Sequence, residues 1–419
     1  MRMQGRTTVP GDKSISHRAL LISALAEGKS EIRGLNRGAD CIRTLTCLRN
    51  LGVEIASHGE VTVVQGRSLR LEKPQEMLTC GNSGTTLRLL AGILAGQDFL
   101  SILDGDDSLR KRPMGRIVEP LRLMGADVYG TGGSNFAPLS IRGGGLWGIH
   151  YELPVPSAQV KSALLLAGLQ GTGTTTILEP IPTRDHTERM LHSCGARIAR
   201  EGNQIQIRGG SILHGQIYQV PGDFSSAAFL IGAAAALPGS ELMLEGVGVN
   251  PTRLGFLDVL EAMGAQVEIL TVEERGGEPY GDLLVRGSRL TSTVVGGEIM
   301  ARLVDEIPIL AVLATQAEGT TVISDAAELR LKESDRLASL TEELTKLGAQ
   351  ITEHPEGLEI TGPTRLKGAQ VHSHGDHRLA LALEVASLFA KGEVEVVGAE
   401  LGDISFPRFA KTLRGLVVG

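Results

Sequence analysis

The stretch LRNLGVEI at residues 48–55 decides the fold, because close copies of it recur along the chain. The other copies are LRLMGADV at 121–128, LHSCGARI at 191–198, LEAMGAQV at 260–267 and LTKLGAQI at 344–351. Successive copies begin 73, 70, 69 and 84 residues apart. Self-similarity at a near-constant period indicates that one structural unit is repeated. A sixth, degraded copy closes the chain as LRGLVV at 413–418.

Each copy has the pattern of a helix that ends and a strand that begins. The leucines suit a last helical turn, the glycine suits the residue after the helix, and the following residues alternate as in a strand. Residues 196–210 then predict a hairpin. Within the longest step, residues 273–282 (EERGGEPYGD) predict a surface hairpin tip.

A second series of segments has a polar start and an apolar helical body, and it also recurs at about 70 residues. These predicted helices cover 11–26, 81–96, 156–169, 222–236, 304–316 and 375–390. The repeated unit therefore holds two helices and several strands, which indicates an α/β fold of six units. Six units divide into two halves of three. VPGD occurs at both 9–12 and 220–223, so we expect one domain of residues 1–11 plus 222–419 and a second domain of residues 12–221.

Composition excludes several classes of protein. With 42% hydrophobic residues, the chain of 419 residues is expected to fold rather than to be disordered. A net charge of −7 and 3% aromatic residues argue against a nucleic-acid binder. Four cysteines without a C-x-x-C pair argue against zinc and disulfides, and favour reduced thiols in the cytoplasm. No apolar run is long enough to span a membrane.

Cations occupy the first turns of the apolar helices, where the helix dipole disfavours them. Serine, aspartate or asparagine at such a position is by itself an ordinary N-cap. The repeated cations are Lys13, Arg18, Arg88, Lys161 and Arg378. Anionic ligands at these helix starts would offset the electrostatic cost. Two carboxylates, Asp305 and Glu333, lie among further cations and could act as acid or base. No G-x-G-x-x-G or Walker lysine motif is present, and these residues alone do not name a reaction.

Taken together and in order, the motifs resemble the 5-enolpyruvylshikimate-3-phosphate synthase family, in its class II branch. The resemblance covers essentially the whole chain. It rests on GDKSISHR (11–18), GNSGTTLR (81–88), KRPMGR (111–116), PSAQVKSA (156–163), RDHTE (184–188), NPTR (250–253), VDEIP (304–308), LKESDR (331–336) and GDHR (375–378).

The resemblance implies a two-domain inverse α/β barrel of six βαβαββ units with the active site in the interdomain cleft. It implies transfer of the enolpyruvyl group from phosphoenolpyruvate to shikimate 3-phosphate, with phosphate released and no metal or other cofactor. We further expect a cytoplasmic monomer that binds neither nucleic acid nor membrane. The resemblance also implies that the chain is a glyphosate target. Gly84 favours sensitivity and the class II features favour tolerance, and the sequence leaves this open.

The family's contacts carry over residue by residue. Those to shikimate 3-phosphate fall on Lys13, Ser14, Arg18, Ser157, Ala158, Gln159, Arg184, Asp305 and Lys332. Those to phosphoenolpyruvate fall on Lys13, Asn82, Gly84, Arg88, Arg112, Gln159, Arg336 and Arg378. The resemblance also implies that Asp305 accepts the proton of the substrate's 5-hydroxyl, and that Glu333, with Lys13 nearby, protonates the C3 methylene.

Two rival functions are weighed against this one. The sister enzyme that transfers enolpyruvate to UDP-N-acetylglucosamine has a catalytic cysteine in its mobile basic loop. The corresponding loop here, SLRKRPMGR at 108–116, contains no cysteine. A non-catalytic repeat scaffold that binds anions would explain the repeats but not Asp305 and Glu333 among the cations.

Overall fold

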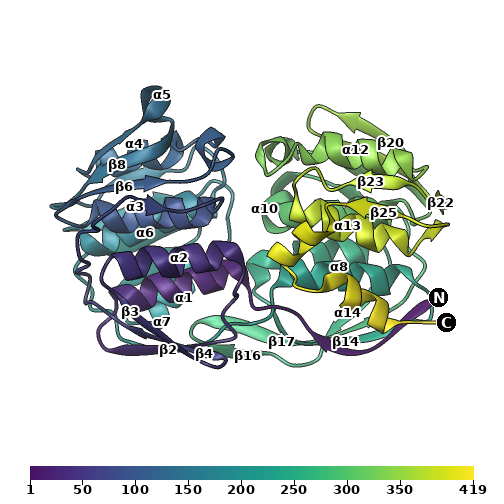
Figure 1. Cartoon of the computed structure of the whole chain (residues 1–419), viewed down its shortest axis with the longest axis horizontal. Helices are drawn as coiled ribbons and strands as arrows, with labels where there is room; N and C mark the ends of the chain where they lie inside the picture. Colours follow the sequence, from purple (N-terminus) through teal and green to yellow (C-terminus); the bar gives the residue numbers. More distant parts are fainter. The chain divides into compact units, whose positions relative to one another are not determined.

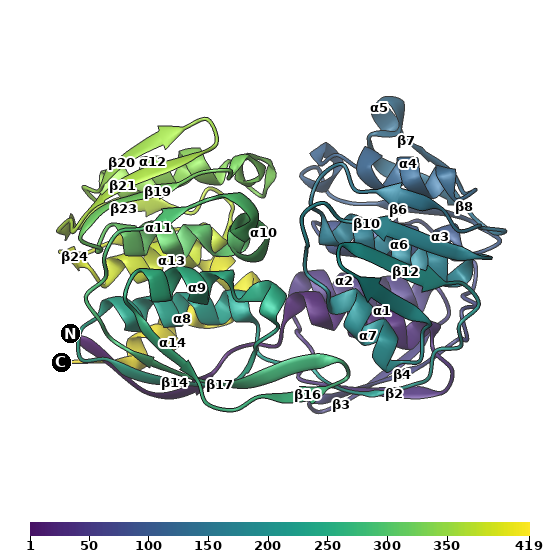
Figure 2. The same ribbon diagram turned by 180° about the vertical axis from the view of Figure 1, so that it is seen from behind.

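The computed structural model describes all 419 residues, and they divide into two compact units. Unit 1 comprises Met1–Pro10, Pro221–Glu273 and Pro279–Gly419. Unit 2 comprises Gly11–Val220 and Glu274–Glu278. Figures 1 and 2 show the ribbon of each unit from opposite sides.

Unit 2 contains three repeats, each made of a strand, a helix, a strand, a helix and two strands. Its helices are α1 (Lys13–Leu25), α2 (Ala39–Asn50), α3 (Gly84–Ala95), α4 (Gly115–Leu123), α5 (Thr131–Ser134), α6 (Ala158–Gln170) and α7 (His186–Ser193), with the 3-10 turn η1 (Leu109–Lys111). Its strands are β2 (Lys29–Arg33), β3 (Glu54–His58), β4 (Val61–Gln65), β5 (Leu78–Thr79), β6 (Leu100–Asp104), β7 (Asp127–Gly130), β8 (Phe136–Arg142), β9 (His150–Glu152), β10 (Thr174–Leu178), β11 (Ile198–Glu201), β12 (Gln204–Arg208) and β13 (Ile217–Gln219).

Each repeat of unit 2 forms one four-stranded sheet, in the orders β13-β2-β4-β3, β5-β6-β8-β7 and β9-β10-β12-β11. In each sheet the first two strands pair in parallel and the next two add in antiparallel fashion. A parallel pair needs a crossover, which α3 supplies between β5 and β6 and α6 supplies between β9 and β10. The last strand of the unit, β13, pairs with β2 and so completes the first sheet.

Unit 1 follows the same plan. Its helices are α8 (Phe224–Ala236), α9 (Gly255–Ala262), α10 (Met300–Leu303), α11 (Ile307–Ala314), α12 (Arg336–Lys346), α13 (His377–Ser387) and α14 (Phe409–Leu416), with 3-10 turns η2 (Pro251–Arg253), η3 (Gly297–Ile299), η4 (Val304–Glu306), η5 (Ala327–Leu331) and η6 (Ala399–Ile404). Its strands, with the hairpin that includes 274–278, are β1 (Arg2–Thr8), β14 (Glu241–Gly248), β15 (Gln266–Ile269), β16 (Glu273–Arg275), β17 (Glu278–Arg286), β18 (Val294–Val295), β19 (Gly319–Ile323), β20 (Gln350–His354), β21 (Gly357–Gly362), β22 (Leu366–Lys367), β23 (Gln370–His372), β24 (Ala390–Lys391), β25 (Glu395–Val397) and β26 (Val417–Val418).

Sheets in unit 1 run β15-β17-β14-β1-β26 and β18-β19-β21-β20, while the sixth repeat is reduced to the parallel pairs β22-β24 and β23-β25. The degraded sixth copy of the sequence phrase has a structural counterpart. Helix α14 runs directly into β26 at Val417 without an intervening glycine, and β26 pairs with β1.

Three apolar helices in each unit pack against one another, and the sheets lie around them (Figures 1 and 2). They are α1, α3 and α6 in unit 2, and α8, α11 and α13 in unit 1. Their close contact needs small residues: a Cβ added to Gly92 of α3 would lie 2.2 Å from the carbonyl oxygen of Ala163 of α6. Helices inside and sheets outside are the inverse arrangement that the resemblance implies, so the fold class is confirmed.

The glycines of the repeated phrase lie at helix ends, as the sequence predicts. Gly52, Gly125, Gly195, Gly264 and Gly348 all have positive φ, between 80° and 101°. Each follows the end of a helix, where this left-handed conformation is nearly free of strain only for glycine. The predicted hairpin at 196–210 is also confirmed, as β11 and β12.

The expected surface tip at 273–282 is partly wrong. Residues 273–275 are exposed, but Glu278 is buried and its Oε1 lies 2.8 Å from Nδ1 of His186. The carboxylate is therefore a buried partner within unit 2 and not part of a solvated loop. Across both units, no helix combines the length and the apolar character that a membrane span requires.

Candidate functional site

The start of α1 brings together the first group of expected residues. Asp12 caps the helix, with Oδ1 accepting from the backbone N–H of Ile15 at 2.8 Å. Lys13 extends to Asp40 at the start of α2, and its Nζ lies 2.8 Å from Oδ2. The carbonyl of Ser14 accepts from Nη1 of Arg18 at 2.9 Å. The cation at this helix start is thus held by a side chain from the neighbouring helix.

Arg18 is buried and its guanidinium is fixed by two hydroxyls. Nε donates to Oγ1 of Thr187 at 2.7 Å, and Nη2 donates to Oγ of Ser162 at 2.8 Å. Burial, with a smaller contribution from the nearby Arg184, lowers the pKa of Arg18 to about 10 against the opposing effect of the Glu188 carboxylate. The group remains a cation at neutral pH, and Arg184 lies close enough to act on it. Thr187 and Ser162 were not expected from the sequence, since polar residues within helices carry no signal of what they contact.

The starts of α3 and α6 bring together a second group. Nη1 of Arg88 donates to Oε1 of Gln159, and Nε2 of Gln159 donates to Oγ1 of Thr85 at 2.9 Å. Nη2 of Arg112 donates to Oδ1 of Asn82. Gly84 lies between the two arginines: a Cβ there would be 3.4 Å from Nη1 of Arg88 and 3.6 Å from Nη1 of Arg112. A larger side chain at this position would occupy the space in front of both guanidiniums.

Three further expected residues have more ordinary placements. Ser157 is the N-cap of α6, with Oγ accepting from the N–H of Val160 at 3.4 Å. Ala158 offers its carbonyl to the hydroxyl of Ser162 at 2.6 Å. Lys332 pairs with the exposed carboxylate of Glu328 at 3.0 Å, and none of its contacts joins it to the other expected residues.

For Lys161, the expectation that an anionic ligand offsets the electrostatic cost of a cation at a helix start is wrong. Its side chain is fully buried in α6, with Nζ 3.0 Å from Oε2 of Glu179 and 2.7 Å from Oε1 of Glu188. The carbonyl of Thr183 accepts a third bond at 3.3 Å. Carboxylates of the protein itself therefore neutralise this lysine, as a buried charge requires. The residues that remain form the helix-start cluster of unit 2: Lys13, Arg18, Asn82, Gly84, Arg88, Arg112, Gln159 and Arg184.

Unit 1 brings together both expected catalytic carboxylates. Nη2 of the buried Arg336 donates to Oε2 of Glu333 at 2.8 Å, and its Nη1 lies 3.6 Å from Oδ1 of Asp305. Arg378, at the start of α13, donates from Nη1 to the backbone carbonyl of Asp305 at 2.9 Å. Its Nη2 also lies 3.6 Å from Oδ2 of that residue. Two guanidiniums thus face one carboxylate.

Asp376 is a member of this group that the sequence analysis did not assign. It caps α13 and accepts from Nε of Arg336 at 2.7 Å, although it is fully buried. Its signal was its place two residues before Arg378 in GDHR, but an N-cap aspartate needs no further role. The carboxylate–arginine cluster of unit 1 therefore consists of Asp305, Glu333, Arg336, Asp376 and Arg378.

Charge pairing controls this cluster. Burial by itself lowers the pKa of Arg336, but the carboxylates of Asp376, Glu333 and Asp305 outweigh it and raise that pKa above the ordinary arginine value. Burial raises the pKa of Asp376, and Arg336 reverses this, so that the pKa lies below the ordinary value. Both groups stay charged, and Arg336 is held ready to present Nη1, which is buried and donates to no protein acceptor. Such a donor can bind an anionic ligand.

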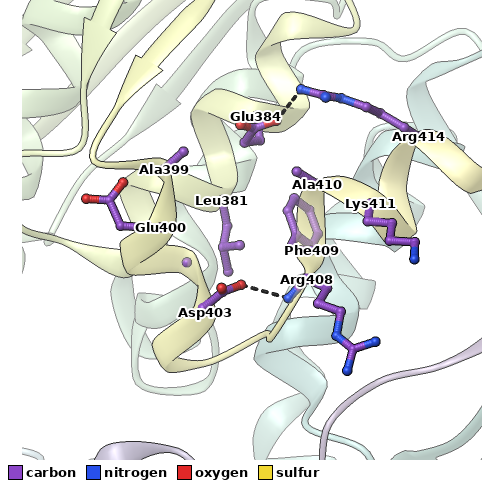
Figure 3. Close-up of a pocket in the computed structure, with 11 residues that line it drawn as sticks. Leu381, Glu384, Ala399, Glu400, Asp403, Arg408, Phe409, Ala410, Lys411 and Arg414 are labelled. Carbon is purple, nitrogen blue, oxygen red and sulfur yellow. Dashed lines mark hydrogen bonds and ion pairs between the residues drawn. The ribbon is translucent and has the colours of Figure 1, made fainter.

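A pocket of about 560 Å³ lies elsewhere in unit 1, between η6, α13 and α14 (Figure 3). Glu384, Asp403, Arg408 and Arg414 line it, and Oδ1 of Asp403 accepts from the backbone N–H of Arg408 at 2.7 Å. None of the expected site residues contributes to its wall. Its charges are of both signs, so it lacks the excess of cations found at the helix starts.

Comparison with known proteins agrees with the motifs. The family described as EPSP synthase (3-phosphoshikimate 1-carboxyvinyltransferase) matches residues 1–413. A 3-phosphoshikimate 1-carboxyvinyltransferase of Synechococcus sp. (strain JA-3-3Ab) is 54% identical, over 99% of this chain and 95% of that protein. The corresponding protein of Alkaliphilus metalliredigens (strain QYMF) is 50% identical, over 99% and 98%.

A solved structure of EPSP synthase from Acinetobacter baumannii superimposes with a TM-score of 0.90 at 42% identity. The match covers 99% of this chain and 96% of that one. Sequence and structure therefore agree over the whole length. The chain belongs to the EPSP synthase family, the 3-phosphoshikimate 1-carboxyvinyltransferases.

Proposed function

We propose that the two clusters, one in each unit, share the work of the family's reaction. The chain transfers the enolpyruvyl group of phosphoenolpyruvate to the 5-hydroxyl of shikimate 3-phosphate and releases phosphate, a step of the shikimate pathway. Addition of the hydroxyl to C2 gives a tetrahedral ketal, and elimination of phosphate from it gives the product. We also expect the enzyme to act as a monomer in the cytoplasm.

The helix-start cluster supplies most of the cations for the anionic groups of both substrates, and Arg336 and Arg378 are the further expected contacts to phosphoenolpyruvate. It holds five cations, Lys13, Arg18, Arg88, Arg112 and Arg184, whereas the carboxylate–arginine cluster has three carboxylates and two guanidiniums. Guanidiniums bind phosphate and carboxylate through paired N–H donors, which an ammonium does less well. The hydroxyls of Ser162 and Thr187 fix Arg18 before the ligand arrives, which reduces the entropy lost on binding.

The carboxylate–arginine cluster supplies the acid–base chemistry, and the observation that carries this is the position of Asp305. Its carboxylate has two guanidiniums at 3.6 Å, Arg336 and Arg378. These cations stabilise the ionised form, so Asp305 is available as the base that accepts the hydroxyl proton.

Glu333 is the proposed acid that protonates the C3 methylene, with Lys13 as the second expected contributor. The hydrogen bond of 2.8 Å from Arg336 favours its charged form. An anionic substrate bound at Nη1 of Arg336 offsets the charge of the guanidinium, which weakens its stabilisation of the Glu333 carboxylate and favours uptake of a proton there. The same arginine would thus bind substrate and release the acid.

Substitution of Asp305 by asparagine tests the assignment of the base. The expected result is a fall in kcat for phosphate release of about 10²- to 10⁴-fold, the usual contribution of a general base, with a much smaller change in KM. Asp258→Asn is the matched control, because Asp258 is an exposed carboxylate of the same unit paired with Arg302. Wild-type kcat in Asp305→Asn would refute this role.

A further inference from the structure

Arg253, the last residue of the NPTR segment, is buried although nothing in the reaction has yet used it. It ends the 3-10 turn η2 with its side chain 4% exposed. Nη2 donates to Oγ of Ser225 at 2.5 Å and to Oε1 of Glu306 at 3.4 Å. Burial of a guanidinium away from water costs free energy unless the charged group is paired.

Glu306 is the other end of the same arrangement. Its side chain is fully buried, and the hydroxyl of Ser225 donates to its Oε1. The three residues come from three separate elements, η2, α8 and η4. A chain of hydrogen bonds from Arg253 through Ser225 to Glu306 therefore ties η4 to the apolar helix α8.

Glu306 directly follows Asp305 in the turn η4, so the contacts that fix Glu306 also fix the backbone next to Asp305. Successive side chains of a 3-10 turn project about 120° apart, so the two carboxylates face different sides. Arg378 also holds the turn, since its Nη1 donates to the carbonyl of Asp305 at 2.9 Å. The turn that carries Asp305 is thus held by two guanidiniums, the buried one of Arg253 and the partly exposed one of Arg378.

We propose that Arg253, Ser225 and Glu306 are positioning residues that hold the turn η4 and thereby orient the carboxylate of Asp305. The inference rests on the proposed role of Asp305 as the base. Stability alone is a weak explanation for the arrangement, since a buried ion pair is often no more stabilising than apolar residues of the same volume. Orientation of a catalytic group is different, because a displacement of about 1 Å can reduce a rate by about 100-fold.

The test uses Glu306→Gln in the full-length chain, with Glu343→Gln as the matched control. Glu343 is equally buried in unit 1 and is paired with Lys346 and His374, but it lies outside both clusters. If Glu306 positions Asp305, Glu306→Gln lowers kcat by about 10- to 100-fold while KM for both substrates changes little. Glu343→Gln lowers the melting temperature but leaves kcat unchanged.

A pH profile separates positioning from a loss of stability. Glu306→Gln leaves the charge of Arg253 unbalanced next to η4. Arg336 from α12 and Arg378 from α13 already face Asp305, with Glu333 and Asp376 paired to Arg336. A further cation favours the ionised base, so the acidic limb of the kcat–pH profile moves to lower pH by about 0.5 unit.

The double variant Glu306→Gln/Arg253→Met removes that extra charge. Its acidic limb returns toward the wild-type position while kcat stays low, because the turn is still not tied. Equal melting-temperature losses in Glu306→Gln and Glu343→Gln, with wild-type kcat and pH profile in both, would overturn the proposal. Asp305→Asn separates the two assignments. If Asp305→Asn retains wild-type kcat, the proposed role of Asp305 as the base is wrong. If Asp305→Asn loses activity but Glu306→Gln retains wild-type kcat, the positioning role of Glu306 is wrong.

Discussion

The guanidinium of Arg336 interacts with three carboxylates at once. Nε donates to Asp376 at 2.7 Å and Nη2 to Glu333 at 2.8 Å, while Nη1 lies 3.6 Å from Asp305. Contacts to three carboxylates need the N–H donors on all three nitrogens of a planar guanidinium. The ammonium of a lysine has only one nitrogen and cannot reach all three. The residue combines the fixed anchor of Asp376 with a donor that remains for substrate.

Arg336→Lys should therefore lower kcat/KM even though the charge is kept. Loss of one or two charge-assisted hydrogen bonds corresponds to a fall in kcat/KM of about 10- to 100-fold. We expect most of this fall to come from a higher KM for phosphoenolpyruvate. Steady-state kinetics with each substrate varied in turn would measure it. Arg286→Lys is the control, since this exposed arginine lies 3.6 Å from Glu241 and from Glu268. Equal effects of the two substitutions would contradict the special role of Arg336.

Residue types indicated which side chains could carry chemistry but not which of them are already paired. Lys161 lies near the start of α6 as Arg88 lies near the start of α3, yet its partners Glu179 and Glu188 lie 18 and 27 residues later in the chain. Local sequence gives no sign of such a partner. Arg253 and Asp376 lie within the motifs NPTR and GDHR, but their partners are also distant in the sequence, so the sequence alone assigned them no role.

Helices and their ends were the most predictable elements. All six apolar segments are helical, because a polar cap followed by an apolar body is a local signal. The five glycines mark helix ends because only glycine takes positive φ there readily. The reduced sheet of the sixth repeat and the burial of Glu278 depend on distant segments, so the sequence pattern did not reveal them.

The helix α1 carries a buried histidine that makes stability depend on pH. Burial lowers the pKa of His17 to about 3, with Lys13 and Arg18 adding to this against Asp40. Its Nδ1 is 2.7 Å from the hydroxyl of Thr44. The unfolded chain binds a proton at this residue near pH 6.5, but the folded chain stays neutral. Protonation therefore favours unfolding as the pH falls from about 6.5 toward about 3 and has no effect above that range.

His17→Gln should flatten this dependence. Between pH 7 and pH 4.5 the wild type should lose about 2 to 3 kcal/mol more in free energy of unfolding than the variant, from the shift in pKa alone. Urea titrations at several pH values would measure the difference in slope. His150→Gln, at an exposed histidine, should keep the wild-type slope. Coincident slopes for wild type and His17→Gln would show that His17 is not held neutral.

The whole molecule carries a net charge of −7, although it acts on two anionic substrates. The helix-start cluster explains how this is possible, since it gathers cations locally against the overall charge. Attraction between partly exposed cations and anionic ligands is screened by salt, over a Debye length of about 10 Å at 0.1 M.

Raising the salt concentration should therefore weaken substrate binding more than it slows the chemistry. Between about 0.05 and about 0.5 M KCl, we expect KM for both substrates to rise several-fold while kcat changes little. Initial rates of phosphate release provide both constants, and kcat serves as the internal control. A KM that is independent of salt would mean that the cations of the helix starts do not attract the substrates.

The most direct test of the account is phosphate release from phosphoenolpyruvate with different acceptors, together with the mass of the product. With shikimate 3-phosphate, the account predicts release of phosphate and an acceptor that gains one enolpyruvyl group. UDP-N-acetylglucosamine should support no release. Release that requires the UDP-sugar, or no release with either acceptor, would contradict the central claim that this chain transfers enolpyruvate to shikimate 3-phosphate.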